Sequence, residues 1–504
     1  MIGAAETSLL VGSALLLGLL VFFLVGSDRM PIGTSGKPIS VYCAAGLQPP
    51  VAAAARAYQD QYGIAIDLTY GGSGTLLSQL SVARSGDLYI AADDSYIRSG
   101  REKGIVDEDL SLAWQVPVLA VARGNSKGIS SLEDLLRDDI SVGFAHPEAA
   151  AVGRIVRQVL IEAGLWEGVQ ARVKVFKPTV MDLANDLKIG TIDLAVIWDA
   201  TAAQYPEIEG VRVQAFDAVR RPISLGVLNW SGQPAAAFHF ARYLAARDKG
   251  LPHFAKRGYT VADGDRWEET PELLLMSGAM LSKAIDETVA EFEQREGVRV
   301  TRIYNGCGIL VSQMKSGSRP DAYFACDQSF LDQVSERFES GQTVSANSMV
   351  ILVAKDNPKK ISGLTDLARP GLRVGLGHPE KSALGSLTVT LLERGGHLAA
   401  LKASGNLVVE SATGDYLVNQ ARAGALDAAI VYRSNTAMVG DHLDTVEIGD
   451  ANAHAVQPYA VARDSTHKQL MGRLLDAIAG QRSQKRFEGL GFDWKCKLPE
   501  MSGR

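Results

Sequence analysis

The sequence predicts an α/β protein made of two tandem domains. Three observations lead to this prediction. The 504-residue chain repeats itself once along its length, short β-rich runs alternate with helical stretches, and the turns between them are rich in small residues. Runs of strand and helix in alternation are typical of α/β architecture.

The internal repeat covers nearly the whole chain. ISVYCAAGLQPP near residue 40 corresponds to LLLMSGAMLSKA near residue 273, VGFAHPEAAAVG to VGLGHPEKSALG, and KIGTIDLAVIWDATA to RAGALDAAIVYRSNTA. Solenoid repeats are much shorter, about 20–50 residues, so a repeat of this length predicts two whole domains. We expect domains at 38–262 and 272–497, a linker at 263–271 and a tail at 498–504.

Composition excludes some partners. With 46% hydrophobic and 21% charged residues the chain resembles ordinary globular protein. A nucleic-acid partner would require a clustered basic surface, whereas the net charge here is -6. A small anion is not excluded, because a local pocket can bind one on an acidic protein.

The N-terminal residues 1–37 are expected to form a membrane anchor and a short linker. Thr7 to Ser27 carries no charge and, as a helix at about 1.5 Å per residue, would span about 30 Å, one hydrocarbon core. A cleaved signal peptide is the alternative, but the basic start is missing and no A-x-A site precedes Ser27. Arg29 and Lys37 come after the segment, which by the positive-inside tendency favours cytoplasmic domains.

Strand and helix signals alternate from the start of the first domain. We expect strands at Ile39–Tyr42, Ile64–Tyr70 and Asp87–Ala91, and helices at Pro50–Tyr62 and Thr75–Arg84. This alternation predicts a mostly parallel sheet with helices on both faces.

Small residues come directly after the strands at matching places in the two halves. The turns are Cys43–Gly46, Gly71–Gly74, Ser277–Ala279 and Asn305–Gly308. Ligands of open α/β sheets bind beyond the carboxyl ends of the strands. A small-residue turn that leads into a helix offers free N–H groups and the positive end of the helix dipole, which suits an anion.

The ordered set of motifs resembles the molybdate/tungstate-binding proteins that serve ABC importers. The motifs are AAGL after the first strand, YGGSGTL, GDLYIAADDSYI, VPVLAVARGN, HPEAAAVG and GTIDLAVIWDAT. The resemblance implies two type II periplasmic-binding domains, each with two α/β lobes, a hinge and an interlobe cleft for an oxyanion. The hinges would lie at Gln115–Ala120, Arg221–Gly226, Asn347–Leu352 and Val456–Val461. It also implies an ABC permease as partner and, with the anchor, a single-pass membrane protein with extracytoplasmic domains.

The resemblance also implies ligand-binding positions. In the first half these are Ala45, Gly46, Gly72, Ser73, Ala151, Val152 and Trp198. In the second half they are Gly278, Ala279, Gly306, Cys307, Ala383, Leu384 and Tyr432.

The family places serines in the first two turns and a tyrosine after the GxxDxAIVY strand. Each half keeps one of these three hydroxyls, Ser73 in the first and Tyr432 in the second. A lost charge-assisted hydrogen bond costs about 1.5–3 kcal/mol unless a backbone N–H or water replaces it.

Structural interpretations stand beside these assignments. Ser73 also suits a cap of the helix expected from Thr75, and Trp198 also suits a cleft wall. His146 and His378 recur in the repeat before a proline, either as structural residues or facing the cleft.

The chain has four cysteines. Cys307 and Cys326 are expected at the carboxyl edge of one sheet, and three interpretations stay open: a disulfide, a redox or soft-ligand pair, or two unlinked buried residues. Cys43 and Cys496 have no evident partners. No CxxC or histidine cluster indicates a metal site, and no cofactor is expected.

No motif predicts an enzyme. A nucleophile elbow, a Walker loop and HExxH are absent from the sequence. Asp193 and Asp427, which are equivalent in the repeat, are expected to be structural.

Two functions remain. One is a membrane-tethered protein that captures a small oxyanion for an ABC importer. The alternative is a ligand sensor or partner-binding module in which one or both clefts have lost their ligand. The hydroxyl set does not decide which cleft is live.

Overall fold

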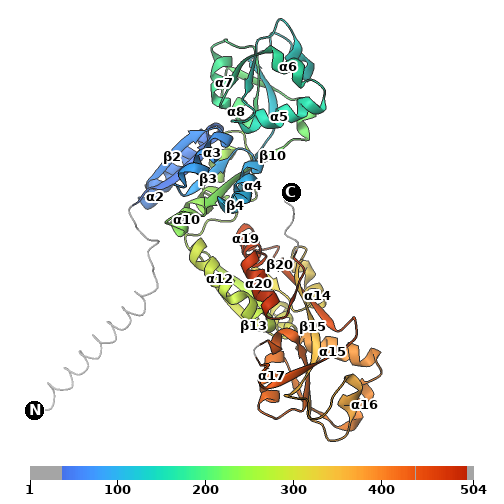
Figure 1. Ribbon diagram of the computed structural model, residues 1–504. Helices are drawn as coiled ribbons and strands as arrows, with labels where there is room; N and C mark the ends of the chain where they lie inside the picture. The colour runs from blue at the N-terminus through green and yellow to red at the C-terminus, as the bar shows by residue number, and fades with distance from the viewer. Residues whose placement is uncertain (1–36, 438, 497–504) are drawn as a thin grey trace, which may run out of the picture.

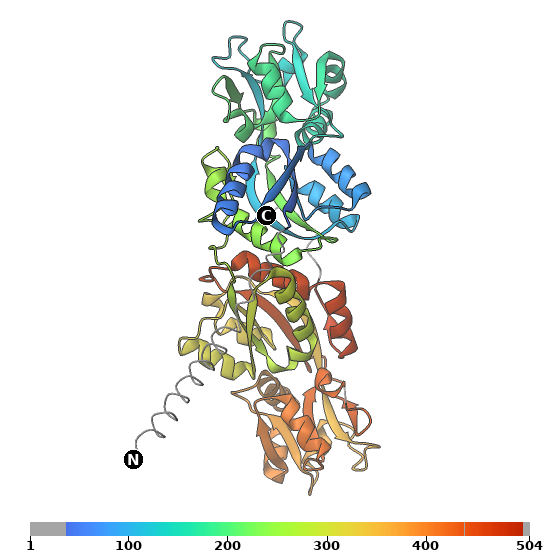
Figure 2. The ribbon, with the colours of Figure 1, turned by 90° about the vertical axis from the view of Figure 1, so that its left-hand side faces the viewer.

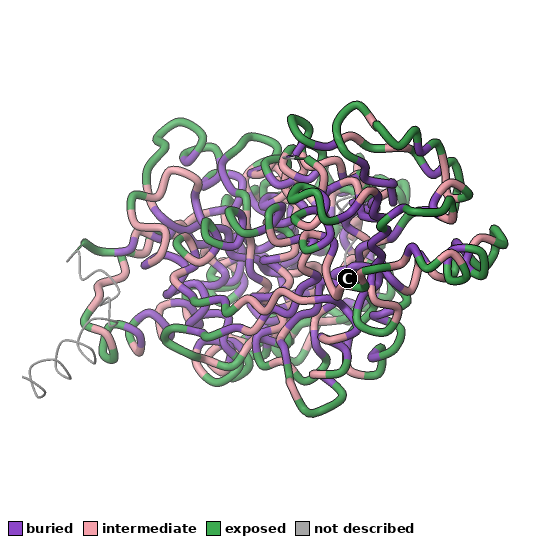
Figure 3. Tube along the Cα trace, turned by 90° about the horizontal axis from the view of Figure 1, so that it is seen from below, coloured by how far each residue is buried: buried purple, intermediate pink, exposed green. Residues whose placement is uncertain are grey.

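Each half of the chain builds two α/β lobes, as the computed structural model of residues 37–437 and 439–496 describes. The four lobes form a row, one after another (Figure 1, Figure 2). We call the lobe that begins and ends each half its inner lobe, because the inner lobes meet at the centre of the row, and the inserted lobe its outer lobe. Buried segments run through the interior of the lobes, and exposed ones form their rims (Figure 3).

The inner lobe of the first domain has a six-stranded sheet in the order β11-β4-β10-β3-β1-β2. Its strands are β1 (Ile39–Ala44), β2 (Ile66–Gly71), β3 (Leu88–Ala91), β4 (Val106–Gln115), β10 (Arg221–Leu228) and β11 (Thr260–Val261). Its helices are η1 (Ala45–Leu47), α2 (Gln48–Tyr62), α3 (Ser73–Ala83), α4 (Asp94–Glu102), α10 (Pro234–Ala245) and α11 (Leu251–Ala255).

The outer lobe of the first domain has a five-stranded sheet in the order β7-β6-β8-β5-β9. Its strands are β5 (Pro117–Ala122), β6 (Val142–Ala145), β7 (Val173–Lys177), β8 (Leu194–Trp198) and β9 (Ile208–Val211). Its helices are η2 (Leu132–Leu136), α5 (Ala151–Glu162), α6 (Trp166–Arg172), α7 (Val180–Lys188), α8 (Asp199–Ala202) and α9 (Gln214–Asp217).

The second domain repeats this plan with one long strand, β15 (Gln342–Ala354), shared by both lobes. Its inner lobe adds β12 (Glu272–Gly278), β13 (Arg299–Asn305), β14 (Ala322–Phe324), β20 (His454–Val461), β21 (Asp493–Trp494), η3 (Ala279–Leu281), α12 (Ser282–Glu296), α13 (Cys307–Lys315), α14 (Gln328–Asp332), η4 (Ser335–Arg337), α19 (Lys468–Ile478) and α20 (Gln481–Gly489). Its outer lobe adds η5 (Leu364–Ala368), β16 (Val374–Gly377), α15 (Ala383–Arg394), α16 (Leu398–Ser404), β17 (Leu407–Ser411), α17 (Gly414–Arg422), β18 (Ala428–Tyr432), α18 (Arg433–Thr436) and β19 (Leu443–Glu447).

Local sequence explains the boundaries of the first long helix, α2. Prolines occupy its first turn, where the missing N–H costs nothing. It ends at Gly63, whose φ of +68° is a left-handed conformation that glycine adopts without strain. Strands β3, β6 and β8 are buried along their whole length, because helices cover both faces of their sheets.

The sheets are mixed rather than mostly parallel, which corrects the sequence prediction. β1 is parallel to β2 and β3, whereas β10 is antiparallel to both β3 and β4. β10 carries the chain back from the outer lobe, so it enters the inner sheet from the opposite end.

Two of the four predicted hinges are also misplaced. The chain leaves the first inner lobe at Val116, between β4 and β5, as expected, and β15 crosses between sheets near Ser348. The return crossings, however, precede β10 and β20, because both strands pair along their length within the inner sheets. They therefore lie at 218–220, after α9 of the outer lobe, and at 448–453, after β19.

Candidate functional site

A small cavity lies between the two lobes of the first domain. Its volume is about 20 Å³, and a single water needs about 10–15 Å³, so it has room for one small ion or a few atoms. It is lined by Ala44, Ala45, Gly46, Leu47, Gly71, Gly72, Ser73, Ala92, Gln115, Ala150, Ala151, Val152, Pro178, Thr179, Val180 and Trp198. All seven residues named from the sequence for the first half are in this set.

The described residues place no charged side chain in the lining of the cavity, and the positive ends of two helix dipoles point toward it. Among the described residues that line it, none is Asp, Glu, Lys, Arg or His. Helices α3 and α5 begin at its wall, and neither N-terminus is capped by a side chain. The first N–H groups of a helix have no intrahelical acceptor, and the dipole adds about half a positive charge at that end. The arrangement therefore suits an anion held by neutral donors.

Ser73 is a buried hydroxyl at the start of α3. It does not cap the helix, because α3 begins at Ser73 itself and Gly72 is its N-cap residue. Its Oγ instead accepts a hydrogen bond of 3.1 Å from the N–H of Ala92. A hydroxyl that accepts one bond still has its own proton to donate. The capping interpretation is thus wrong, and Ser73 has a donor left for a ligand.

The two lobes are closed on each other at Gly72. A Cβ atom added there would collide with the backbone oxygen of Ala149 and lie 2.7 Å from that of Pro178, both in the outer lobe. The N–H of Gly74 donates to the oxygen of Ala149 at 3.1 Å. Glycine is needed at position 72 because the outer-lobe backbone comes this close.

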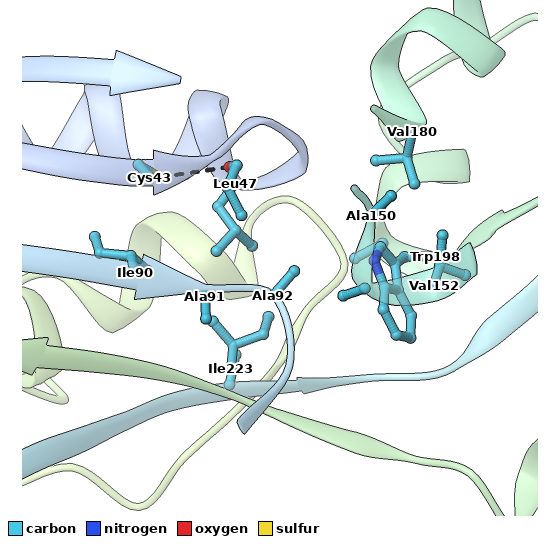
Figure 4. Close-up of a cluster of buried hydrophobic side chains, with 14 of the residues drawn as sticks. Cys43, Leu47, Ile90, Ala91, Ala92, Ala150, Val152, Val180, Trp198 and Ile223 are labelled. Carbon is cyan, nitrogen blue, oxygen red and sulfur yellow. Dashed lines mark hydrogen bonds between the residues drawn. The ribbon is translucent and has the colours of Figure 1, made fainter. Parts of the chain in front are cut away.

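Trp198 lies on the outer-lobe wall of the cavity. Its side chain is 2% exposed. Figure 4 shows it beside Ala150 and Val152, facing Leu47 and Ala92 of the inner lobe across the gap.

Two polar lining residues were missed in the sequence. Gln115 ends β4 at the crossing and donates to the oxygen of Ala92 at 2.6 Å. Thr179 precedes α7 and accepts from the N–H of Asp182 at 3.2 Å. The strand–turn–helix pattern at 173–188, repeated at 407–422, was the available signal for Thr179.

The same position in the second domain carries a larger side chain. Helices η1 and η3 align Gly46 with Met280, not with Ala279 as inferred from the sequence. Across the cleft, helices α7 and α17 align Val180 with Gly414. The first domain thus has Gly46 and Val180 at these two positions, and the second has Met280 and Gly414. Met280 is 8% exposed.

Two cysteines also distinguish the second domain from the first. Cys307 occupies the position of Ser73 and is joined to Cys326 by a disulfide. This decides between the three interpretations left open and excludes two unlinked thiols. Gly278 packs against this bridge, since a Cβ there would collide with Cys326 Sγ. Cys43 and Cys496 are buried free thiols.

The other side chains predicted at the second site are also buried. Tyr432 ends β18 with 3% exposure, and its hydroxyl has no hydrogen-bond partner among residues 37–437 and 439–496. Burial, and then the charge of Asp327, raises the pKa of Tyr432 well above its usual value. Ala383 and Leu384 begin α15 and are buried. Gly306 abuts the backbone oxygens of the outer lobe, so this domain is closed as well.

The recurring histidines and aspartates have structural partners. His146 and His378 each accept, through Nδ1, the N–H two residues further on, at 3.2 Å. Asp193 accepts from the N–H and hydroxyl of Ser141, and these bonds outweigh partial burial and lower its pKa. Asp427 accepts from Arg373, which lowers its pKa.

The described residues contain neither a cluster suited to a metal ion nor a helix suited to a membrane. Within 37–437 and 439–496, no three His, Cys, Asp or Glu residues are grouped to hold a metal ion. In the same residues no helix has both the length and the apolar character to cross a membrane. The predicted anchor at Thr7–Ser27 lies outside the described residues.

Comparison with known proteins adds a family match. A family profile described as bacterial extracellular solute-binding protein matches residues 39–260 and again residues 273–493. The two matches correspond to the two halves of the internal repeat.

Individual relatives match one half of the chain. The molybdate-binding protein ModA of Mycobacterium tuberculosis (strain H37Rv) is 30% identical over 220 residues, 42% of this chain and 81% of that protein. A putative binding protein of Haemophilus influenzae is 24% identical over 222 residues, 44% of this chain and 90% of that protein. The periplasmic molybdate-binding protein of Azotobacter vinelandii is similar in structure, with a TM-score of 0.40 and 15% identity over 44% of this chain and 99% of that one.

Proposed function

The chain belongs to the bacterial extracellular solute-binding protein family, and on that premise we propose that it captures a tetrahedral oxyanion of the molybdate type for an ABC importer. The ligand is held in the cleft of the first domain. A permease receives it, and the N-terminal segment tethers the protein to the membrane with its domains outside the cytoplasm.

One observation carries the proposal. The two lobes of the first domain enclose a cavity the size of one small ion, walled by uncapped helix N-termini and by no charged side chain. Such a site favours an anion through N–H donors and helix dipoles, and its size excludes sugars and peptides. The 30% identity to a molybdate-binding protein supports the same ligand class.

The second domain has a supporting role in this proposal. By the repeat, Met280 and the disulfide-bonded Cys307 stand where the first cleft has Gly46 and Ser73, and all of these second-domain side chains are buried. We therefore expect one bound anion per chain. This also favours a limited form of the alternative function, in which the second domain serves protein contacts rather than ligand capture.

The test is calorimetric titration of the full chain with molybdate, tungstate and sulfate. We expect submicromolar binding of one equivalent of at least one anion. Ser73→Ala should weaken binding by about tenfold or more, because it removes a charge-assisted hydrogen bond worth about 1.5–3 kcal/mol. Ser78→Ala is the matched control, since Ser78 lies on the same helix, bonds to the Gly74 oxygen and does not line the cavity.

Absence of heat with all three anions would contradict the proposal. Two equivalents, or equal affinity in the Ser73→Ala variant, would contradict the assignment of the site to the first cleft.

A further inference from the structure

A second cavity of the first domain lies beside the anion cleft and is lined by arginines. Its volume is about 500 Å³. Its walls include Arg98 of α4, Arg154 and Arg157 of α5, and Arg221 at the start of β10. Because α4 belongs to the inner lobe and α5 to the outer lobe, both lobes contribute walls to this arginine cavity.

Two of the arginines pair with inner-lobe residues, and one of them, Arg154 of the outer-lobe helix α5, thereby links the two lobes. Arg154 lies 3.9 Å from the ring centre of Tyr96 and donates to Ser95 and Asp93, all in the inner lobe. Arg221 also approaches Asp93, with 3.4 Å between Nε and Oδ2. Asp93 is fully buried, so these two cations balance a buried charge and have a structural role.

The other two arginines are available to a ligand. Arg98 pairs with Asp94 of its own helix, and the two side chains are 39% and 11% exposed. Arg157 pairs with Glu148 at 3.5 Å, and the two side chains are 43% and 79% exposed. The Arg157–Glu148 pair is exposed and contributes little energy, so an anion can displace Glu148 at small cost. Arg98 keeps its pair with the largely buried Asp94 and donates its remaining N–H groups to the anion. A guanidinium group binds phosphate or carboxylate oxygens in a bidentate manner.

The second domain shows that the fold does not require this charge. Matching the helices and strands of the two halves aligns Arg98 with Asp332, Arg154 with Ser386, Arg157 with Val389 and Arg221 with Ala455. The second copy closes its lobes with none of the four arginines.

We propose that the arginine cavity binds a small polyvalent oxyanion, such as pyrophosphate, between Arg98 of the inner lobe and Arg157 of the outer lobe. The cavity is far larger than the roughly 20 Å³ anion cleft. Its volume falls in the range of about 300–1,000 Å³ typical of small-molecule sites. A ligand with two charged groups can meet one guanidinium on each side.

Binding in the arginine cavity stabilises the closed form of the first domain, because Arg98 and Arg157 lie on different lobes and come together only when the lobes close. If the first cleft holds an oxyanion as proposed above, the two ligands are coupled. Each then raises the affinity of the other by the same factor, as linkage requires. The site itself does not depend on that proposal.

The test is calorimetric titration of the full chain with pyrophosphate, and separately with citrate to distinguish phosphate from carboxylate recognition. The test variant carries Arg98→Ala and Arg157→Val, which leave the interlobe contacts of Arg154 intact. The control carries Arg172→Ala and Arg319→Ala. Both arginines are exposed and lie outside the cavity, and the two substitutions remove as much charge as those in the test variant. Arg157→Val alone is the second variant if the double variant does not fold.

We expect one equivalent of pyrophosphate or citrate, weakened by about tenfold or more in the test variant and unchanged in the control. Binding of neither probe, or equal losses in test and control variants, would overturn the proposal. Molybdate titration of the same samples separates the two proposals, because failure of the first cleft leaves the pyrophosphate result intact.

Discussion

Single residues decide which cleft is open. Gly46 contributes no side chain to the first cleft, and a Cβ there would lie 3.0 Å from Val180 Cγ2 and 3.3 Å from Thr201 Oγ1. The second domain has Met280 at this position and a glycine opposite. Interiors are packed without spare volume, so one such exchange is enough to fill a cavity of about 20 Å³.

We expect Gly46→Met to abolish oxyanion binding in the first cleft, with a loss of about a hundredfold or about 2.7 kcal/mol. The methionine would occupy the cavity and press against Val180. Calorimetric titration with molybdate measures the loss. Met280→Gly is the matched control and should leave the first-cleft affinity unchanged. Wild-type affinity in Gly46→Met would show that the ligand binds elsewhere.

Secondary-structure elements converge on both clefts in the same way. Helices α3 and α5 begin at the first cleft, and α13 and α15 begin at the equivalent place in the second. The two domains differ in the residues just after the strands. In the second domain the Cys307–Cys326 bridge ties the start of α13 to the end of β14, where the first domain has Ser73 bonded to Ala92. A hydrogen bond with a donor to spare is replaced by a covalent link.

The disulfide should stabilise the second domain without affecting anion binding. Closing a loop of this size contributes about 3 kcal/mol in the chain-entropy account, so reductant should lower the melting temperature of the second domain. Differential scanning calorimetry with and without dithiothreitol measures this. Cys307→Ser with Cys326→Ser should melt at the lower temperature in both buffers. A change of oxyanion stoichiometry on reduction would mean that the second cleft also binds.

At the scale of the whole molecule, a buried ion cluster joins the two inner lobes. Glu296, which is 1% exposed, accepts two bonds of 2.6 and 3.0 Å from Arg473 and lies 3.6 Å from Arg242 of the first domain. Nearby, Arg295 donates two bonds of 2.7 Å to Glu108 across the junction. Figure 1 shows α10, α12 and α19 meeting here. The junction thus fixes how the two domains are oriented.

Glu296→Gln should destabilise the protein by about 3–5 kcal/mol, because it leaves two buried guanidinium groups without a counter-charge. Urea unfolding followed by circular dichroism measures the change. Glu108→Gln is the control, and its partly exposed pair should cost about 1 kcal/mol or less. Equal losses in the two variants would show that burial of the cluster is unimportant.

Local sequence patterns were sufficient to predict the architecture and the position of the first cleft. The repeat, the alternation of elements and the turns after strands are such patterns, and they indicated the turn of Gly72 and Ser73 on the inner-lobe side. The positions of Ala151, Val152 and Trp198, which line the outer-lobe side of the same cavity, followed from the resemblance to the family. In each lobe the backbone explains these positions, because the carboxyl ends of the parallel strands and the helices after them share one edge of that lobe's sheet.

Which cleft is open depends on tertiary contacts, and three of them show why. Met280 is buried in the second domain, where the first has Gly46 and a Val180 that a Cβ on Gly46 would touch, and the Cys307 bridge depends on two turns that meet 19 residues apart. The direction of β10 depends on the return of the chain from the outer lobe. Local sequence patterns do not encode such contacts, since they depend on packing between segments that meet only in the folded chain.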